Sequence, residues 1–338
     1  MRKGYSRRSF LKSTLSAGVA IAGAQLAFSE EPGSRRRTEK IKDQYDPKGL
    51  PTTVLGKTGV RIPRIAIGLG SRFLNIKTLD EALEMCNYAL DNGLYYWDTA
   101  HSYVNTETGA ISEERLGHIV KDRRKEIFLS TKIAERDPEK AKTEVELSLK
   151  RLQTDHLDML KIHAVESMEE VKNICRQGGV LDLFSRLKED GVTRFIGFSG
   201  HGNATALKAM IETGRFDSML FAMNHYDGNK ENRQGTLIPS ARERGMGIML
   251  MKTVRPKETI NGIDPAELVR FALSLEGPNG IAVGMDSKKV VDSNLNILRN
   301  FKPMNADEKL KYARLLAPYF RHENLEWMKK GYHDGYLG

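Results

Sequence analysis

Three short apolar runs of the chain each end in a polar side chain that can take part in proton transfer. Residues 95–97 are followed by Asp98, residues 127–131 by Lys132, and residues 157–162 by His163. Tyr103 comes shortly after Asp98 in the following loop. If the runs are parallel strands of one barrel, their carboxyl ends meet at one mouth, where the sequence predicts an acid, a base, an imidazole and a phenol facing one another.

These four side chains suit the reduction of a carbonyl group. A phenol has an ordinary pKa near ~10, too high for an effective proton donor near neutral pH, and an adjacent ammonium lowers it. Lys132 can supply that ammonium, and Asp98 can keep it charged and in place. A neutral His163 can donate a hydrogen bond to the substrate oxygen and hold it near Tyr103.

The elements that must position these groups alternate regularly along the chain. Eight apolar runs of strand length are separated by eight longer amphipathic segments of helical period, and the set extends from residue 65 to residue 300. This predicts an α/β fold of the (β/α)8 (TIM) barrel type, which typically takes about 250 residues. An open doubly wound sheet is the alternative, but residues 68–73 lack the third glycine of its nucleotide loop. The expected strands are 65–68, 95–98, 127–132, 157–163, 193–199, 218–223, 247–251 and 280–283.

Two motifs give the chain a resemblance to the aldo-keto reductase family. D-T-A-H-S-Y at residues 98–103, followed by S-E-E-R-L-G at 112–117, resembles the signature of that family. The opening at residues 55–63 is similar to the N-terminal β-hairpin that closes the barrel floor in the family. The resemblance implies a catalytic tetrad of Asp98, Tyr103, Lys132 and His163. It also implies hydride transfer between a nicotinamide cofactor, NADP or NAD, and a small-molecule carbonyl or alcohol.

The same resemblance implies where the cofactor binds, although several positions depart from the family pattern. The fifth strand ends in G-F-S-G-H rather than G-V-S-N, and the usual glutamine after the sixth strand is replaced. Met251 could pack on the nicotinamide ring or simply fill the core. Two lysines near the eighth strand, Lys288 and Lys289, favour NADP over NAD. The expected cofactor contacts are Ser199, Asn224, Met251, Lys252, Gly284, Ser287, Lys288 and Asn294.

The N-terminal segment resembles a twin-arginine (Tat) signal peptide. S-R-R-S-F-L-K at residues 6–12 precedes an uncharged apolar stretch at 15–28, which is shorter than the ~20 residues of a membrane-spanning helix. We expect a signal peptide at 1–29, a linker at 30–50, the barrel at 51–303 and a C-terminal helical extension at 304–338. The resemblance implies export by the Tat translocase to the periplasm, with no stable membrane span after cleavage, or retention as an anchor if the signal is not cleaved. Free nicotinamide cofactor is not expected there, which suggests a tightly held one.

Composition excludes several other classes of protein. Two cysteines cannot form a disulfide scaffold or a four-cysteine metal site, and no metal is expected. The net charge of +9 is concentrated at the N-terminus, so binding to nucleic acid is not expected. A non-catalytic cofactor sensor or scaffold is the alternative function, and a barrel hydrolase or isomerase is a third. Residues 304–338 could cap the mouth or, as we prefer, pack against the outside; substrate identity, direction and oligomeric state stay open.

Overall fold

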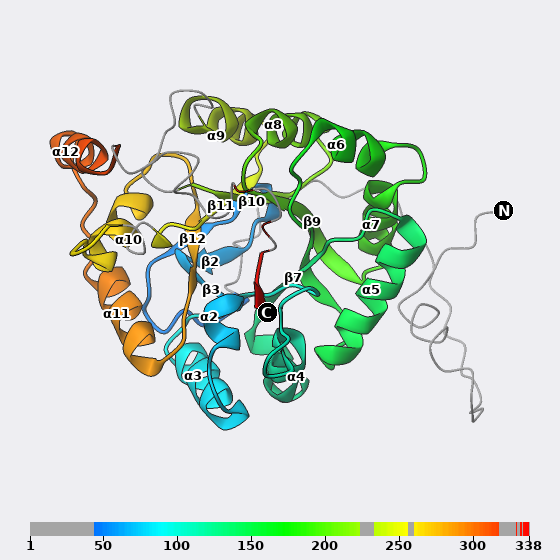
Figure 1. Cartoon of the computed structure of the whole chain (residues 1–338), viewed down its shortest axis with the longest axis horizontal. Coiled ribbons are helices and arrows are strands. Elements are labelled where there is room, and N and C mark those ends of the chain that lie inside the picture. Colours follow the sequence, from blue (N-terminus) through cyan, green and yellow to red (C-terminus); the bar gives the residue numbers. More distant parts are fainter. Residues whose placement is uncertain are drawn as a thin grey trace, which may run out of the picture.

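Eight parallel strands form a closed barrel, as the sequence predicts. The computed structural model describes residues 44–223, 233–255, 260–317, 329, 332 and 334–337. Each strand pairs with the next along the chain, and the last pairs with the first to close the barrel (Figure 1). All carboxyl ends therefore lie at the same end of the barrel. The strands are β3 (Ile65–Gly68), β4 (Tyr96–Asp98), β7 (Phe128–Ile133), β8 (Leu157–Ile162), β9 (Thr193–Gly200), β10 (Ser218–Ala222), β11 (Gly247–Met251) and β12 (Gly280–Gly284).

Helices surround the barrel and cover its outer face (Figure 1). Several begin with a capping box, in which a side chain such as Thr78 or Ser167 accepts from a backbone N–H and a glutamate three residues later reaches back. In the part of the chain that the structure describes, none of these helices has the length and apolar character needed to cross a membrane. The helices are α2 (Ser71–Leu74), α3 (Leu79–Asp91), α4 (Ser112–Arg123), α5 (Pro138–Arg151), α6 (Met168–Cys175), α7 (Val180–Glu189), α8 (Ala204–Glu212), α9 (Arg233–Glu243), α10 (Pro265–Leu273), α11 (Lys288–Arg299) and α12 (Ala306–Leu316).

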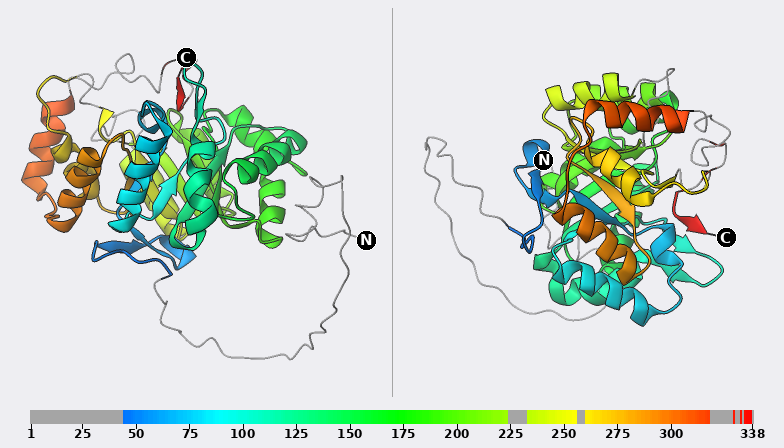
Figure 2. Two further views of the ribbon diagram at one scale, coloured as in Figure 1. Left: turned by 90° about the horizontal axis from the view of Figure 1, so that it is seen from below. Right: turned by 90° about the vertical axis from the view of Figure 1, so that its left-hand side faces the viewer.

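A hairpin of β1 (Thr52–Val54) and β2 (Arg61–Pro63) closes the amino-terminal end of the barrel, as expected. Its turn packs against the start of β11, where Leu55 is fully buried and a side chain at Gly247 would lie 2.5 Å from it. Figure 2 shows the hairpin at the end of the barrel opposite to the C-terminus. The hairpin therefore blocks one end, and substrates must approach from the other.

The C-terminal segment differs from the expectation that it packs against the outside. Helix α12 does lie outside the barrel, next to α10, but the last described strand, β13 (Tyr336–Leu337), lies over the mouth (Figures 1 and 2). β13 pairs with β5 (Val104–Asn105), which also pairs with β6 (Ala110–Ile111). A small three-stranded sheet thus joins the end of the chain to the loop that follows Asp98.

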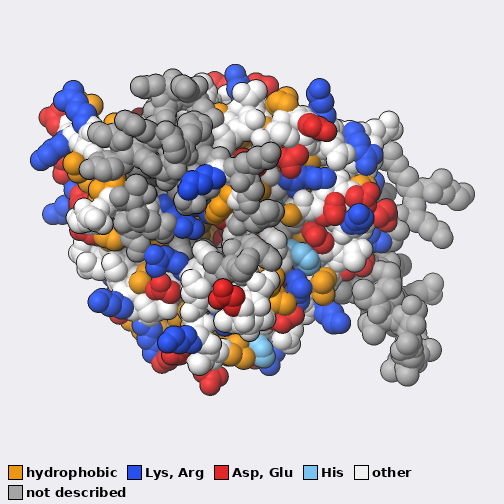
Figure 3. Space-filling model, viewed as in Figure 1, with side chains coloured by type: hydrophobic (Ala, Val, Ile, Leu, Met, Phe, Trp, Pro, Cys, Tyr) orange, Lys and Arg blue, Asp and Glu red, His pale blue; other side chains and the backbone are white. Residues whose placement is uncertain are grey.

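The face of the molecule that carries the mouth has a mixed surface charge. Lysine, arginine and acidic side chains alternate over the described residues on this face, with a hollow near its centre (Figure 3).

Candidate active site

The four side chains predicted from the strand ends come together at the mouth of the barrel. Asp98 is the last residue of β4, Lys132 lies near the end of β7, and His163 directly follows β8. Lys132 Nζ lies 2.7 Å from Asp98 Oδ2 and donates to the hydroxyl of Tyr103 at 3.1 Å. The Tyr103 ring packs edge-on against His163, with ring centres 5.6 Å apart. All four side chains are buried, so they interact with little screening by water.

A second lysine that sequence reasoning missed, Lys161, shares the Asp98 carboxylate. Its Nζ lies 2.6 Å from Asp98 Oδ1 and 2.8 Å from the hydroxyl of Ser130, and its side chain is fully buried. Because side chains alternate along a strand, Lys161 points to the same side as His163, two residues later. The available signal was a lysine two residues before His163, in a strand whose only other charged residue is Asp158. One buried carboxylate therefore faces two ammonium groups.

Burial and the neighbouring charges together set the protonation states of Asp98, Lys132 and Tyr103. Burial alone would raise the pKa of Asp98, but Lys132 and Lys161 bring it below its ordinary value. Burial lowers the pKa of Lys132; Asp98 opposes this effect and Lys161 adds to it. Burial, together with the neighbouring Asp334 and Asp98 carboxylates, raises the pKa of Tyr103 well above its ordinary value. The phenol thus holds its proton.

His163 is oriented as a neutral hydrogen-bond donor. Burial lowers the pKa of His163 to about 4. Its Nδ1 lies 3.2 Å from the hydroxyl of Ser102. When Ser102 donates to Nδ1, the ring proton is on Nε2, which faces the same point as the Tyr103 hydroxyl. Two donors therefore converge where a carbonyl oxygen can accept both.

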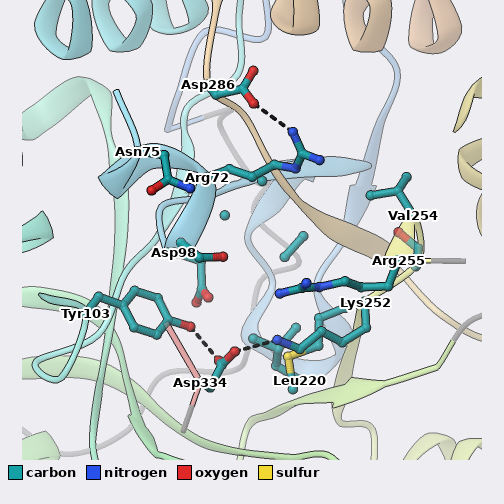
Figure 4. A pocket seen from close by; sticks show the side chains of 17 residues that line it. Arg72, Asn75, Asp98, Tyr103, Leu220, Lys252, Val254, Arg255, Asp286 and Asp334 are labelled. Carbon is teal, nitrogen blue, oxygen red and sulfur yellow. Dashed lines mark hydrogen bonds and ion pairs between the residues drawn. The ribbon is translucent and has the colours of Figure 1, made fainter. Parts of the chain in front are cut away.

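The group found at that point is the carboxylate of Asp334, which the sequence did not indicate. Tyr103 donates to Asp334 Oδ2 at 2.8 Å, and His163 Nε2 lies 3.3 Å from the same oxygen. Lys252 Nζ lies 2.5 Å from Asp334 Oδ1 (Figure 4). The C-terminal segment therefore places an anion on the two donors of the site.

A pocket of about 370 Å³ opens at this cluster, and Asp98, Tyr103 and Asp334 line part of it. Three predicted cofactor residues line it: Met251, Lys252 and Gly284. Thr253 also lines it, and among the described residues its buried hydroxyl has no hydrogen-bond partner. A buried hydroxyl of this kind needs a partner, which a ligand oxygen can supply.

Two arginines add positive charge to the same pocket. Arg72 on α2 and Arg255 after β11 both line it (Figure 4). Arg72 pairs with Asp286 at 2.7 Å across the pocket wall. The lining also holds the carboxylates of Asp98, Asp286 and Asp334, so it offers as many acids as cations. Arginine side chains can hold a phosphate group through two hydrogen bonds.

The other predicted cofactor residues do not line this pocket. Ser199 is buried near the end of β9, and its hydroxyl accepts from the backbone N–H of Ala164 at 3.1 Å. Asn294 lies within α11 and donates to the carbonyl of Val290 at 2.8 Å. Asn224 lies outside the described residues. Cofactor contacts at these positions stay predictions.

The remaining two predicted cofactor residues, Ser287 and Lys288, lie at the start of α11. Ser287 caps this helix by accepting from the backbone of Val290. Lys288 forms an ion pair with Glu84 on α3 and is half-exposed. The Ser287 hydroxyl lies 3.2 Å from an Asp286 carboxylate oxygen. A role with the cofactor is likewise a prediction for both residues. Among the described residues, no group of three or more acidic, histidine or cysteine side chains is arranged to bind a metal ion.

Comparisons with known proteins agree with this geometry. The chain is 27% identical over 217 residues to an uncharacterized oxidoreductase of Bacillus subtilis and 27% identical over 211 residues to the L-galactose dehydrogenase of Arabidopsis thaliana. Each match covers 58% of this chain, and 64% and 62% of the two relatives, so the chain spans less than two thirds of their length.

Solved structures show the same fold. An aldo-keto reductase from Bacillus halodurans in its holo form superposes with a TM-score of 0.66 at 19% identity, covering 81% of this chain and 99% of that one. An aldo/keto reductase from Klebsiella pneumoniae in complex with NADP and acetate has a TM-score of 0.63 at 18% identity, covering 80% and 96%. The Aldo/keto reductase family model matches residues 65–256, more than half of the sequence, and the chain belongs to that family.

Proposed function

We propose that the protein is an NADP-dependent oxidoreductase that reduces a small-molecule carbonyl, with Tyr103 as the proton donor. The observation that carries this proposal is the contact between Lys132 and the Tyr103 hydroxyl at 3.1 Å, with Lys132 also held by Asp98. This arrangement stabilises the phenolate that remains after proton transfer. The nicotinamide cofactor supplies hydride to the carbonyl carbon when bound.

Each residue has a distinct part in the proton transfer. His163 is neutral and donates through Nε2 to the carbonyl oxygen, which polarises the carbonyl. Tyr103 gives its proton to that oxygen. Lys132 compensates the negative charge left on the phenol oxygen, and Asp98, itself held by Lys161, keeps Lys132 in place.

NADP is favoured over NAD, and three observations support cofactor binding at the described pocket. These are the arginines Arg72 and Arg255, the unpartnered hydroxyl of Thr253, and the NADP complex of the Klebsiella pneumoniae relative. Titration of both cofactors should give the lower Kd for NADP. Changing Lys288 and Lys289 to alanine should remove the preference if they bind the 2′-phosphate.

Export by the Tat pathway is the proposed localisation, supported by S-R-R-S-F-L-K at residues 6–12. Changing Arg7 and Arg8 to lysine should keep the protein in the cytoplasm, which cell fractionation can measure. If the exported protein keeps its cofactor, protein purified without added nucleotide should release close to one equivalent of NADP on denaturation.

Turnover separates this function from the non-catalytic alternative. NADPH oxidation should be followed with a panel of aldehydes and ketones, beside fluorescence titration of NADPH. Turnover supports a reductase. Tight cofactor binding without turnover of any carbonyl would indicate a cofactor sensor or scaffold.

A further inference from the structure

The C-terminal segment approaches the catalytic tyrosine closely. Gly335 is buried with φ +71°, and a Cβ built on it would lie 2.1 Å from Tyr103 Cδ1. Only glycine fits this position, both for the positive φ and for the contact with the ring. The next residues form β13 beside β5, which begins directly after Tyr103. Asp334 is thereby placed above the hydroxyl of Tyr103.

Asp334 makes more polar contacts than a surface loop residue would. Its side chain is only 7% exposed. Oδ2 accepts from Tyr103 and His163, and Oδ1 faces Lys252 and accepts from the Tyr332 hydroxyl at 2.9 Å.

The charges around Asp334 favour its ionised form. Burial alone would raise the pKa of Asp334, but the Lys252 ammonium, the hydrogen bond from His163 and the nearby His201 hold it well below its usual range. Asp334 therefore acts as an anion bound by the site.

These contacts use the donors that a carbonyl substrate needs. Tyr103 has one hydroxyl proton, and it is given to Asp334 Oδ2. The Nε2 of His163 faces the same oxygen. A carbonyl oxygen cannot accept from both groups while Asp334 is in place, so the two compete for one position.

We propose that Asp334 is an internal ligand of the donors Tyr103, His163 and Lys252, and that carbonyl substrates and small carboxylates bind there by displacing the C-terminal segment. Displacement of the segment by a carbonyl substrate rests on the proposed function, whereas its displacement by a carboxylate does not. The segment is suited to leave because β13 has only two residues, so few backbone hydrogen bonds hold it.

The internal ligand also indicates which ligands replace it best. Its two oxygens are held separately, one by Tyr103 and His163 and the other by Lys252. A carboxylate, or a carbonyl that carries a carboxylate on the neighbouring carbon, can fill both positions. A simple alkyl aldehyde fills only the first and leaves Lys252 without its anion. The site therefore favours 2-oxo acids among carbonyl compounds.

Binding of acetate to the full chain tests the internal ligand without relying on turnover. Its Kd should be measured by NMR of ¹³C-labelled acetate for the wild type and Asp334→Ala, with Asp307→Asn on the exposed start of α12 as the matched control. If the segment is in place about nine-tenths of the time, removing its carboxylate tightens acetate binding about tenfold. The control should bind acetate like the wild type. Equal or weaker binding by Asp334→Ala would overturn the proposal.

A second variant dislodges the segment without removing the carboxylate. Gly335→Ala should tighten acetate binding in the same direction, because its Cβ cannot fit against Tyr103. Acetate should also speed amide hydrogen exchange of residues 334–337 in the wild type. Unchanged exchange at saturating acetate, or a Gly335→Ala variant that melts like the wild type and binds acetate no better, would show that the segment is not displaced.

Steady-state kinetics then separate this proposal from the proposed function. For a 2-oxo acid such as pyruvate, Asp334→Ala should lower KM by the same factor as the acetate Kd, with kcat within about twofold. Tighter acetate binding with no turnover of any carbonyl supports the carboxylate site and contradicts the reductase. Turnover with identical KM and acetate Kd in both proteins contradicts the internal ligand alone.

Discussion

Two buried aspartates, at opposite ends of the barrel strands, each bind two cations. At the carboxyl end, Asp98 lies between Lys132 and Lys161, at 2.7 and 2.6 Å. Near the amino end, Asp158 on β8 lies between Arg124 and Arg194, at 2.8 and 2.7 Å. The same carboxylate chemistry is therefore used twice, with different cations.

The second aspartate ties separate parts of the chain together. Asp158 also accepts from the Tyr45 hydroxyl at 2.7 Å and from the backbone N–H of Leu129 at 2.9 Å. Arg124 directly follows α4, and Arg194 lies at the start of β9. Every contact of Asp158 is with a structural partner, and none faces the mouth.

The difference between lysine and arginine explains the two roles. A guanidinium keeps its charge and holds a carboxylate through a planar set of donors, which suits a fixed structural joint. An ammonium is compact and can have its pKa lowered on burial, as Lys132 shows. Lys132 also has a donor left for Tyr103, so the lysine site can take part in proton transfer.

Removing the reacting groups of the lysine site should have the largest effect. Tyr103→Phe and Lys132→Met should each lower kcat for carbonyl reduction by about 10³-fold, because the proton donor or its partner is lost. The Kd for NADPH should stay within a few fold, since little contact surface is removed. Stopped-flow and steady-state kinetics measure both. Reduction near the wild-type rate by Tyr103→Phe would refute its assignment as the donor.

A change at the arginine site should affect stability and leave catalysis intact. Asp158→Asn leaves two guanidinium groups near a neutral side chain and should lower the free energy of unfolding by about 3 kcal/mol. Denaturation in urea measures this loss. Asp91→Asn, which removes an exposed partner of Arg123, is the control and should cost less than about 1 kcal/mol. A fall in kcat of the folded Asp158→Asn protein would show that the aspartate at the amino end also affects catalysis, contrary to the purely structural role assigned to it.

Another buried carboxylate, Glu113, has no cation within hydrogen-bonding distance of its oxygens among the described residues. Its ionised form should therefore destabilise the folded protein. Its Oε1 accepts from Thr131 at 2.6 Å, whereas its Oε2 has no hydrogen-bond partner among the described residues. The nearest guanidinium nitrogen, on Arg151, is 3.7 Å away. Burial raises the pKa of Glu113 to about 7.

The sign of the pH dependence follows from this raised pKa. The folded protein keeps a proton on Glu113 that the unfolded chain, with an ordinary pKa of 4.5, releases earlier. The resulting stability is present below pH 4.5 and is lost as the pH rises through about 7. Relative to Glu113→Gln, the wild type should lose about 3 kcal/mol of unfolding free energy over this range. Urea denaturation of both proteins at pH 5 and pH 8 measures the difference, and parallel pH dependences would contradict it.

The smallest expected effect on catalysis comes from replacing Lys161, the second lysine at the mouth. Lys161→Met removes a positive charge that balances Asp98, and the Asp98 carboxylate raises the pKa of Tyr103. The phenol pKa should therefore rise further, because less positive charge remains to stabilise the phenolate. We expect kcat to fall about tenfold, KM to change little, and the alkaline limb of the kcat profile for reduction to move to higher pH.

A second variant, Lys161→Gln, separates the charge of Lys161 from its hydrogen bond to Asp98. Lys161→Gln keeps a donor to Asp98 without the charge and should behave like Lys161→Met. The other groups that face this cluster, namely Asp334, His163, Tyr96 and Lys252, are the same in all three proteins. A Lys161→Gln profile identical to that of the wild type would show that only the hydrogen bond matters.

The sequence by itself determined the barrel and the four side chains that meet at its mouth. Alternating strand and helix patterns are local, and the closed barrel of eight parallel strands confirms the predicted architecture. Once parallel strands are assumed, a polar residue that ends an apolar run must lie at the mouth. That reasoning placed Asp98, Lys132 and His163 correctly, and the loop length placed Tyr103 beside them.

Only the tertiary structure decided what surrounds those four groups. Lys161 meets Asp98 across the width of β7, and that contact depends on the register of three strands rather than on any one of them. Tyr103 and Asp334 are 231 residues apart, and nothing in the local pattern of the C-terminal segment indicates that it returns to the mouth. Local periodicity fixes which face a side chain takes, whereas pairing between distant segments depends on how the whole chain closes.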